Sequence, residues 1–219
     1  MIAMSLVFDL DNTLLNIRAY NKHVYKIIAR YLSKKYNINS LKISKYLLKL
    51  WEKKGSRYPN LFDDLVKKFN INQQEVKIMV ELYNNYNGKM KLYPDVKYVL
   101  KKLKSKKYKL GIITDGNLIR QRTKVRNTNL RSFFDVIIYT AEKNQPKPNY
   151  QPYLEIIKRL DVRPYDSFYI GDDPDVDFEG AKKIGMQTIR IKRGEFKVKK
   201  SNQFIDYTIH KLKDIIKII

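Results

Sequence analysis

The 219-residue chain contains no cysteine and only two histidines. The absence of cysteine excludes disulfide bonds, thiolate nucleophiles and metal sites built on thiolates. No apolar run approaches the ~20 residues that a bilayer-spanning helix needs. The start, MIAMSLVFDLD, lacks the basic region of a signal peptide and reaches Asp9 too early for one. We therefore expect a cytoplasmic protein with no membrane contact.

Acidic residues are scarce relative to basic ones. Asp and Glu number 22 against 45 Lys and Arg, which gives a formal net charge of +23. Such a surface attracts phosphates, nucleic acids and anionic lipids through its long-range field. The lysines are spread along the whole chain, however, and form no basic tail. A solvated basic surface is the favoured interpretation, so nucleic acid is not the expected partner.

Five short apolar runs predict buried strands, at residues 5–9, 110–114, 135–139, 167–171 and 188–191. The runs do not alternate with polar residues, which is typical of parallel strands covered on both faces. From the second run onward, segments with apolar residues at helical spacing separate the strands, as in PYLEIIKRLD and DFEGAKKIG. This alternation predicts a doubly wound, Rossmann-like α/β core.

Residues 16–90 interrupt the alternation, because they contain only amphipathic helical segments, about four in number. We therefore expect a core formed by residues 1–15 and 91–219, with an all-helical insert over residues 16–90. Arg57 lies in the segment GSRYP between two of these helices. Because loops often carry specificity, Arg57 is a candidate for binding the substrate.

Polar residues follow four of the predicted strands. They are Asp9 and Asp11 after the first strand, Thr114, Asp115, Gly116 and Asn117 after the second, Lys147 after the third, and Asp172, Asp173 and Asp177 after the fourth. In an open parallel sheet, ligands bind beyond the carboxyl ends of the strands. If the strands are adjacent, these groups meet in one cleft.

Clustered carboxylates need a cation to stay ionised together. With no Cys or His nearby they favour a hard, oxygen-binding ion such as Mg²⁺, which would also accept a phosphate oxygen. Lys147 and the hydroxyl and N–H groups of residues 114–117 are suitable donors to the remaining phosphate oxygens. An aspartate that attacks phosphorus forms an aspartyl-phosphate, a known covalent intermediate. The pattern therefore predicts a metal-dependent phosphoryl-transfer site.

Four motifs, in this order along the chain, resemble the haloacid dehalogenase (HAD) superfamily. They are FDLDNT, IITDGN, the Lys-Pro pair at 147–148 and GDDPDVDFEGAKKIGM. The resemblance covers Met4 to about Arg193, and the helical insert resembles the C1-type cap of that superfamily. Within the superfamily, the chain most resembles archaeal members that act on small phosphometabolites, including a glyceraldehyde-3-phosphate phosphatase-like group.

The resemblance implies a role for each acid. Asp9 is expected to be the nucleophile, and Asp11 to protonate the leaving oxygen and then activate water. Mg²⁺ would be held by the Asp9 carboxylate, the backbone carbonyl of Asp11, and Asp172. Asp177 would orient a metal-bound water or the motif lysine. Asp173 occupies a position where Ser or Asn is frequent, so which of Asp172, Asp173 and Asp177 contacts the metal most directly stays open.

The resemblance also implies a phosphate-binding set. Thr114 and Lys147 would bind the phosphoryl group, with help from the backbone at Asp115 and Gly116. Asn117 offers a further donor, but it could equally cap the next helix.

The predicted function is therefore a Mg²⁺-dependent phosphatase that hydrolyses small phosphomonoesters through an aspartyl-phosphate, with the helical cap closing over the substrate. Asp11 argues against dehalogenation, because the dehalogenases of the superfamily lack an acid there. Two alternatives stay open: a phosphomutase of the same superfamily, and a basic nucleic-acid-binding protein on this scaffold, against which the intact acids argue. The particular substrate and the oligomeric state stay open as well.

Overall fold

The computed structural model describes residues 4–219 and divides into two compact units. One unit contains the chain up to Ile17 together with Met90–Ile219, and the other contains Arg18–Lys89. We refer to them as the core unit and the helical unit. None of the helices found between residues 4 and 219 is both long and apolar enough to span a bilayer.

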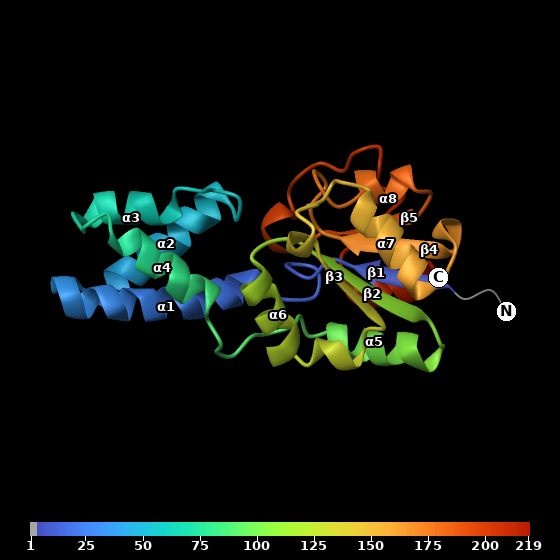
Figure 1. Ribbon diagram of the computed structural model, residues 1–219, viewed down its shortest axis with the longest axis horizontal. Coiled ribbons are helices and arrows are strands. Elements are labelled where there is room, and N and C mark those ends of the chain that lie inside the picture. Colours follow the sequence, from blue (N-terminus) through green and yellow to red (C-terminus); the bar gives the residue numbers. More distant parts are fainter. Residues whose placement is uncertain (1–3) are drawn as a thin grey trace. The chain divides into compact units, whose positions relative to one another are not determined.

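A six-stranded parallel sheet with the order β3-β2-β1-β4-β5-β6 forms the centre of the core unit. Its strands are β1 (Ser5–Phe8), β2 (Lys109–Thr114), β3 (Val136–Tyr139), β4 (Ser167–Gly171), β5 (Gln187–Ile191) and β6 (Tyr207–Ile209). The chain proceeds outward from β1 through β2 to β3, and then returns to the other side of β1 to form β4 and β5 (Figure 1). This is the doubly wound α/β topology, so the predicted fold class is confirmed.

Helices cover both faces of the sheet. They are α5 (Val96–Ser105), α6 (Leu118–Asn127), α7 (Gln151–Leu160) and α8 (Glu179–Lys183). Helices α7 and α8 lie on one side of the sheet and α5 on the other (Figure 1). Gly111 of β2 lets α7 approach closely, because a Cβ atom there would lie 2.6 Å from Cδ1 of Ile156. Strands β1 to β5 are therefore largely buried, as their unbroken apolar runs predict.

The sixth strand is the one strand that the sequence did not indicate. Of the three residues in β6, only Ile209 is buried. A short strand at the edge of a sheet needs no apolar run, because most of its side chains face water. For this reason β6 gives no sequence signal, whereas the five predicted strands are all present.

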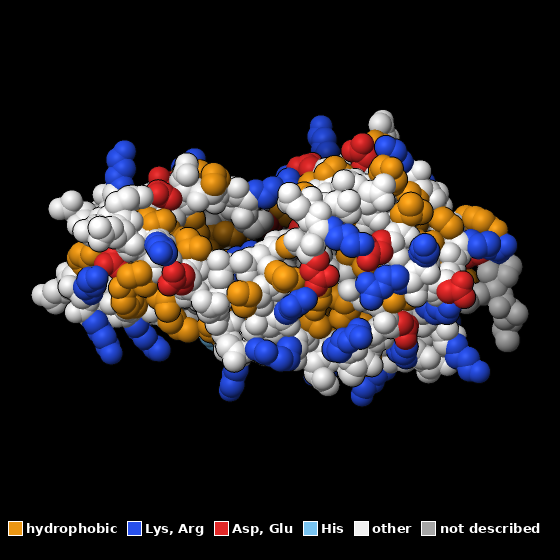
Figure 2. All heavy atoms as spheres, viewed as in Figure 1, with side chains coloured by type: hydrophobic (Ala, Val, Ile, Leu, Met, Phe, Trp, Pro, Cys, Tyr) orange, Lys and Arg blue, Asp and Glu red, His pale blue; other side chains and the backbone are white. Residues whose placement is uncertain are grey.

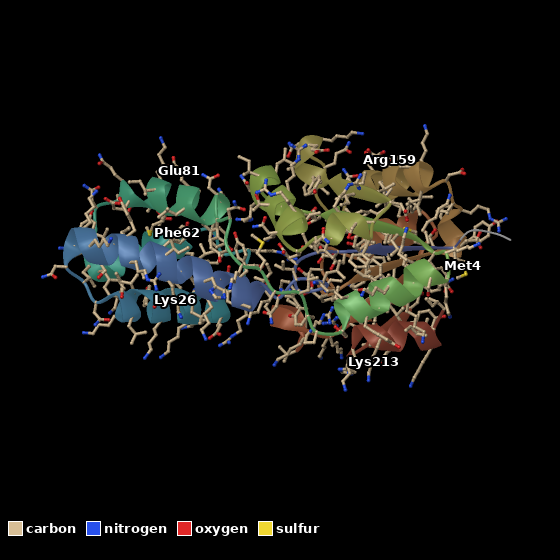
Figure 3. All side chains as sticks on the ribbon, turned by 90° about the horizontal axis from the view of Figure 1, so that it is seen from below. Met4, Lys26, Phe62, Glu81, Arg159 and Lys213 are labelled. Carbon is tan, nitrogen blue, oxygen red and sulfur yellow. The ribbon has the colours of Figure 1, made fainter. Side chains whose placement is uncertain are left out.

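The helical unit is built from amphipathic helices. Their bounds are α1 (Ile17–Tyr36), whose first residue belongs to the core unit, α2 (Ser40–Lys54), α3 (Leu61–Phe69) and α4 (Glu75–Asn84). Their apolar faces meet one another: Phe62 of α3 is buried and its ring centroid lies 6.1 Å from that of Tyr83 of α4. Lys26 of α1, by contrast, lies on the exposed face (Figure 3).

A buried carboxylate joins α1 to α4. Glu75, the first residue of α4, is only 3% exposed. Its oxygens accept hydrogen bonds from the Tyr31 hydroxyl at 2.7 Å, the Lys35 ammonium at 2.5 Å and the Tyr36 hydroxyl at 3.0 Å. The bond from Lys35 is the main cause that lowers the pKa of Glu75, and the two tyrosines act in the same direction against burial. The ionised form of Glu75 therefore stabilises the helical unit.

We predict that Glu75→Gln lowers the free energy of unfolding by about 1–3 kcal/mol at neutral pH, because charge-assisted hydrogen bonds are lost. Since the folded-state pKa of Glu75 is lowered, its contribution is present above about pH 4.5 and is lost as the pH falls through the folded-state value. Urea unfolding at several pH values measures the effect. The difference between the two proteins narrows in acid.

Glu81→Gln provides the control, because Glu81 lies on the same helix and is exposed (Figure 3). It is expected to change stability by less than about 0.5 kcal/mol. Equal effects of the two substitutions would show that the contacts of Glu75 do not stabilise the unit.

Candidate active site

Three strands place polar side chains at one edge of the sheet. Asp9 directly follows β1, Thr114 ends β2, and Asp172 directly follows β4. The Asp9 N–H donates to the Ile170 carbonyl oxygen at 2.8 Å, which continues the β1–β4 pairing to the nucleophile candidate. Because β1 lies between β2 and β4, these residues meet where the strand order reverses. That position is the usual ligand site of open α/β sheets.

Three buried aspartates come together there. Asp9, Asp172 and Asp177 each contribute a carboxylate oxygen, and these atoms lie within 4.8 Å of one another. Their exposed fractions are 6%, 3% and 1%. Ionised carboxylates that are this close together and this little exposed to solvent repel one another strongly unless a positive charge lies between them.

Lys147 supplies one such charge. Its Nζ atom lies 2.7 Å from Oδ1 of Asp9 and 2.7 Å from Oδ1 of Asp177, and it is within 3.3 Å of the Tyr169 hydroxyl. Burial by itself would lower the pKa of Lys147, but the carboxylates of Asp177 and Asp9 outweigh burial and hold that pKa well above its usual range. The lysine is therefore a permanently charged ammonium between two acids.

One ammonium does not balance three carboxylates. Burial, together with Asp177 and Asp11, raises the pKa of Asp9 to about 7 despite the opposing pull of Lys147. Burial also raises the pKa of Asp172 well above its usual range, and Asp9 and Asp177 add to this effect. In addition, Oδ2 of Asp9 and Oδ2 of Asp172 are buried and accept no hydrogen bond from the described residues. An all-oxygen donor set with unsatisfied atoms and excess negative charge could hold a hard divalent cation.

The acids that follow β4 differ in their surroundings. Asp177 accepts hydrogen bonds on both oxygens, from Lys147 on Oδ1 and from the Asp173 N–H at 2.9 Å on Oδ2. The Asp173 carboxylate instead accepts from the Asp175 N–H at 3.1 Å and lies 3.8 Å from the Lys199 ammonium. The structure therefore groups Asp172 and Asp177 with Asp9, and it does not place Asp173 in that group.

Asp11 is hydrogen-bonded by residues other than the three clustered aspartates. Its Oδ2 atom accepts from the Lys124 ammonium at 2.6 Å and from the Gln121 side-chain amide at 3.0 Å, both on α6. Lys124 is 2% exposed. Burial lowers its pKa to about 8, although the Asp11 carboxylate acts in the opposite direction. Neither contact is implied by the four sequence motifs.

Around the end of β2, the Thr114 hydroxyl is available as a donor, whereas Asp115 and Asn117 hold neighbouring segments in place. The Thr114 hydroxyl is buried and has no hydrogen-bond partner among the described residues, so it is available to a ligand. Asp115 accepts from the Thr140 hydroxyl at 2.7 Å and from the Lys147 backbone N–H at 3.2 Å. Asn117 caps α6, with its side-chain oxygen accepting from the Arg120 N–H at 3.1 Å. The capping alternative for Asn117 is therefore the role that its contact shows.

Gly116 and Arg57 were also candidates from the sequence. Gly116 has a φ angle of +110°, and a Cβ atom there would lie 3.2 Å from an Arg120 nitrogen and 3.3 Å from the Gln121 amide nitrogen. The positive φ angle of this turn therefore favours glycine, and a larger residue would also need small shifts of the two neighbouring side chains. Arg57 belongs to the helical unit, where it is exposed in the turn between α2 and α3.

Arg193 was not predicted as a site residue from the sequence, but it fixes the loop after β1. Its guanidinium donates to the carbonyl oxygens of Asn12, at 3.2 Å, and Thr13. It also pairs with Asp95 at 3.0 Å and lies 4.0 Å from the centre of the Tyr93 ring. A loop whose carbonyls are held in this way keeps Asp9 and Asp11 in fixed directions.

Three residues that contact the site acids were not predicted from the sequence, and the reason is the same for each. Tyr169 lies inside an apolar strand, and Gln121 and Lys124 lie inside an amphipathic helix, where each fits the local pattern. One signal was available: positions 117, 121 and 124 follow one another at four and three residues, so they share a face of the helix that begins beside β2. That spacing could have placed Gln121 and Lys124 near the strand ends.

The Lys and Arg side chains on the visible face do not gather into a single basic patch (Figure 2). Lys and Arg side chains are spread across the visible face, among neutral and acidic ones (Figure 2). This distribution agrees with a solvated surface.

Fold and site together are those of a hydrolase that handles phosphate esters. The model of the haloacid dehalogenase-like hydrolases matches residues 6–191, and the chain belongs to this family. It is 34% identical to the glyceraldehyde 3-phosphate phosphatase of Methanocaldococcus jannaschii, with 98% of this chain and 96% of the relative covered. It is also 30% identical to the phosphoglycolate phosphatase of Aquifex aeolicus over 59% of each chain. The resemblance drawn from the four motifs is thus confirmed.

Solved structures agree with this assignment. A HAD phosphatase from Thermococcus onnurineus is similar with a TM-score of 0.65 and 29% identity, covering 100% of this chain and 97% of the other. A HAD-superfamily hydrolase from Geobacter sulfurreducens has a TM-score of 0.74 at 17% identity, covering 99% and 96%, and supports the fold alone. The enzyme class is accordingly a phosphatase, a phosphoric monoester hydrolase.

We predict that Asp115→Ala lowers the free energy of unfolding by about 1–3 kcal/mol, because two buried donors lose a carboxylate acceptor. It also lowers phosphatase activity, since the backbone of Lys147 is no longer held. Asp115→Asn is the matched control, because its amide oxygen still accepts from both donors. Urea unfolding and phosphate release check the pair. A stable, active Asp115→Ala protein would contradict this structural role.

Proposed function

We propose that the chain is a Mg²⁺-dependent phosphatase that hydrolyses small phosphomonoesters through an aspartyl-phosphate on Asp9. The observation that carries the proposal is the buried group of Asp9, Asp172 and Asp177 around Lys147, with two carboxylate oxygens left unsatisfied. A purely structural cluster has no reason to leave buried acceptors without partners.

The residues present fit a magnesium ion. Asp9 and Asp172 offer the unsatisfied carboxylate oxygens, the backbone carbonyl of Asp11 is the expected third ligand, and Asp177 stays hydrogen-bonded to Lys147. Bound there, Mg²⁺ would neutralise the acids and polarise a phosphate oxygen. Asp173, whose carboxylate lies 3.8 Å from the Lys199 ammonium, has a structural role in this proposal.

The chain's own residues account for two transfer steps. A carboxylate oxygen of Asp9 attacks phosphorus, the bond from phosphorus to the leaving oxygen breaks, and that oxygen takes a proton from the Asp11 carboxyl group. Water then attacks the phosphorus of the aspartyl-phosphate and gives a proton to the Asp11 carboxylate. The bond between phosphorus and the Asp9 oxygen breaks, which releases phosphate and restores Asp9.

The phosphoryl group itself needs fixed donors. Lys147 carries a permanent charge within 2.7 Å of Asp9, and the unpartnered Thr114 hydroxyl lies at the end of the neighbouring strand. Phosphoryl transfer depends mainly on such positioning and charge neutralisation.

The names of two relatives support a small phosphomonoester as the substrate. The near-full-length relative at 34% identity is a glyceraldehyde 3-phosphate phosphatase, and a second relative is a phosphoglycolate phosphatase. Both names refer to small phosphorylated metabolites with two or three carbons. We propose a substrate of this size, with glyceraldehyde 3-phosphate as the compound to test first in a phosphate-release screen with and without Mg²⁺.

We predict that Asp9→Asn lowers kcat by at least about 10⁴-fold, because an amide oxygen cannot act as the nucleophile. The substitution preserves shape, so the far-ultraviolet circular dichroism spectrum stays unchanged. Mass spectrometry of quenched wild-type enzyme finds a phosphoryl group on the peptide that contains Asp9, and the variant has none. Retained turnover of p-nitrophenyl phosphate by Asp9→Asn would refute the assignment.

We further predict that Mg²⁺ binding releases protons. Without metal, the raised pKa of Asp9, about 7, leaves this acid about half protonated at neutral pH, and the ion favours its ionised form. The share released by Asp9 is therefore large below pH 7 and falls as the pH rises through about 7. Titration calorimetry in two buffers of different ionisation enthalpy measures it.

Two asparagine variants test, in the same experiment, which of the neighbouring residues Asp172 and Asp173 binds the metal. Asp172→Asn weakens Mg²⁺ binding by at least about tenfold, because a ligand is lost, whereas Asp173→Asn leaves it within about threefold. Equal losses in the two variants would show that the metal does not distinguish these neighbours. Binding without proton release below pH 7 would argue against Asp9 as a ligand.

A further inference from the structure

Lys124 is a buried cation that the proposed reaction does not yet use. It lies on α6 in the core unit and is 2% exposed, so its ammonium group is almost completely removed from water. A lysine in this position carries a large desolvation cost unless it meets a carboxylate. The carboxylate that it meets is that of Asp11, at 2.6 Å.

Gln121 approaches the same oxygen. Its side-chain Nε2 atom donates to Oδ2 of Asp11 at 3.0 Å and also donates to the backbone carbonyl oxygen of Asp115. Gln121 therefore connects the segments that follow β1 and β2. Because Gln121 and Lys124 lie three residues apart on one helix, a single rigid element presents both donors.

The two oxygens of Asp11 have different surroundings. Oδ2 accepts from both α6 donors, whereas Oδ1 is buried and has no hydrogen-bond partner among the described residues. A carboxyl group that exchanges a proton with a reacting oxygen needs one oxygen free and a fixed orientation. A carboxylate held through one oxygen by two donors on a helix satisfies both conditions.

We propose that Lys124 and Gln121 are positioning residues, which hold Oδ2 of Asp11 and thereby present Oδ1 as the atom that exchanges the proton. This inference rests on the proposed function, in which Asp11 first protonates the leaving oxygen and later accepts a proton from water. In this proposal, both residues act on the reaction through Asp11.

A purely structural salt bridge would give a different result. If Lys124 only stabilised the fold, its removal would disturb all steps of the reaction equally. Positioning of an acid predicts selectivity instead. An alkyl leaving group needs a proton as it departs, whereas a p-nitrophenolate leaving group does not.

The test is rapid-quench measurement of phosphoenzyme formation in the full chain with Mg²⁺, using Lys124→Met. We expect formation from glyceraldehyde 3-phosphate to slow by about 10- to 100-fold, and formation from p-nitrophenyl phosphate to change by less than about threefold. Hydrolysis of the phosphoenzyme slows equally for both substrates, because Asp11 must still accept a proton from water.

Lys104→Met is the matched control. Lys104 forms an ion pair with Asp135 at 2.8 Å in the same unit, but at exposed positions away from the site. This variant is expected to form and hydrolyse the phosphoenzyme at wild-type rates. Thermal unfolding of both variants shows whether each protein is folded at the assay temperature.

A second variant guards against misfolding of the first. Gln121→Leu removes one donor and keeps the ion pair, so it is expected to show the same selectivity for alkyl esters with a smaller effect. In an Asp11→Asn background, Lys124→Met is expected to add less than about a twofold loss, because the two residues act through one carboxyl group.

The outcomes are distinct. Equal slowing of both esters by both variants, no slowing by either, or a full additional loss in the double variant would each overturn the positioning role while leaving the proposed function in place. A wild-type protein that forms no phosphoenzyme from either ester would overturn the proposed function, and the inference with it.

Discussion

The buried ammonium of Lys147 is the interaction on which the site depends. It lies 2.7 Å from both Asp9 and Asp177, and its positive charge offsets part of the repulsion between these two buried carboxylates. The lysine balances only part of the charge, since Asp172 lies in the same group. The remaining negative charge and the unsatisfied oxygens of Asp9 and Asp172 are what distinguish this cluster from a closed salt bridge.

Neighbouring residues fix the positions of Lys147 and of the aspartates around it. Asp115 holds the backbone of Lys147 from the end of β2, and Tyr169 reaches Lys147 and Asp177 from inside β4. Arg193 binds the carbonyls of the loop after β1. Such supports matter because electrostatic catalysis works through groups that are already oriented before the reaction starts. These supporting groups come from β4 and from the segments that follow β2 and β5.

The sequence predicted the fold and the acidic groups by separate signals. Unbroken apolar runs indicated the five strands β1 to β5, and the order of strands and helices indicated the doubly wound sheet. The exposed β6 left no such signal. Asp9 and Asp172 were candidates because they directly follow buried strands, and Lys147 because its loop follows β3, since parallel strands end at one edge of the sheet. Lys124 and Gln121 were not, because a polar residue within a helix is ordinary until the partner of that helix is known.

The sequence by itself determined the five strands β1 to β5, the fold class and the acids that directly follow strands, because these follow from local periodicity and from the direction of parallel strands. Only the tertiary structure decided which neighbours share a contact: that Asp177 joins Asp9 and Asp172, that Asp173 faces Lys199, and that Asp11 is held from α6. The physical reason is that pairings between charges depend on distances of a few ångströms between segments far apart in the chain, and no local pattern encodes those distances.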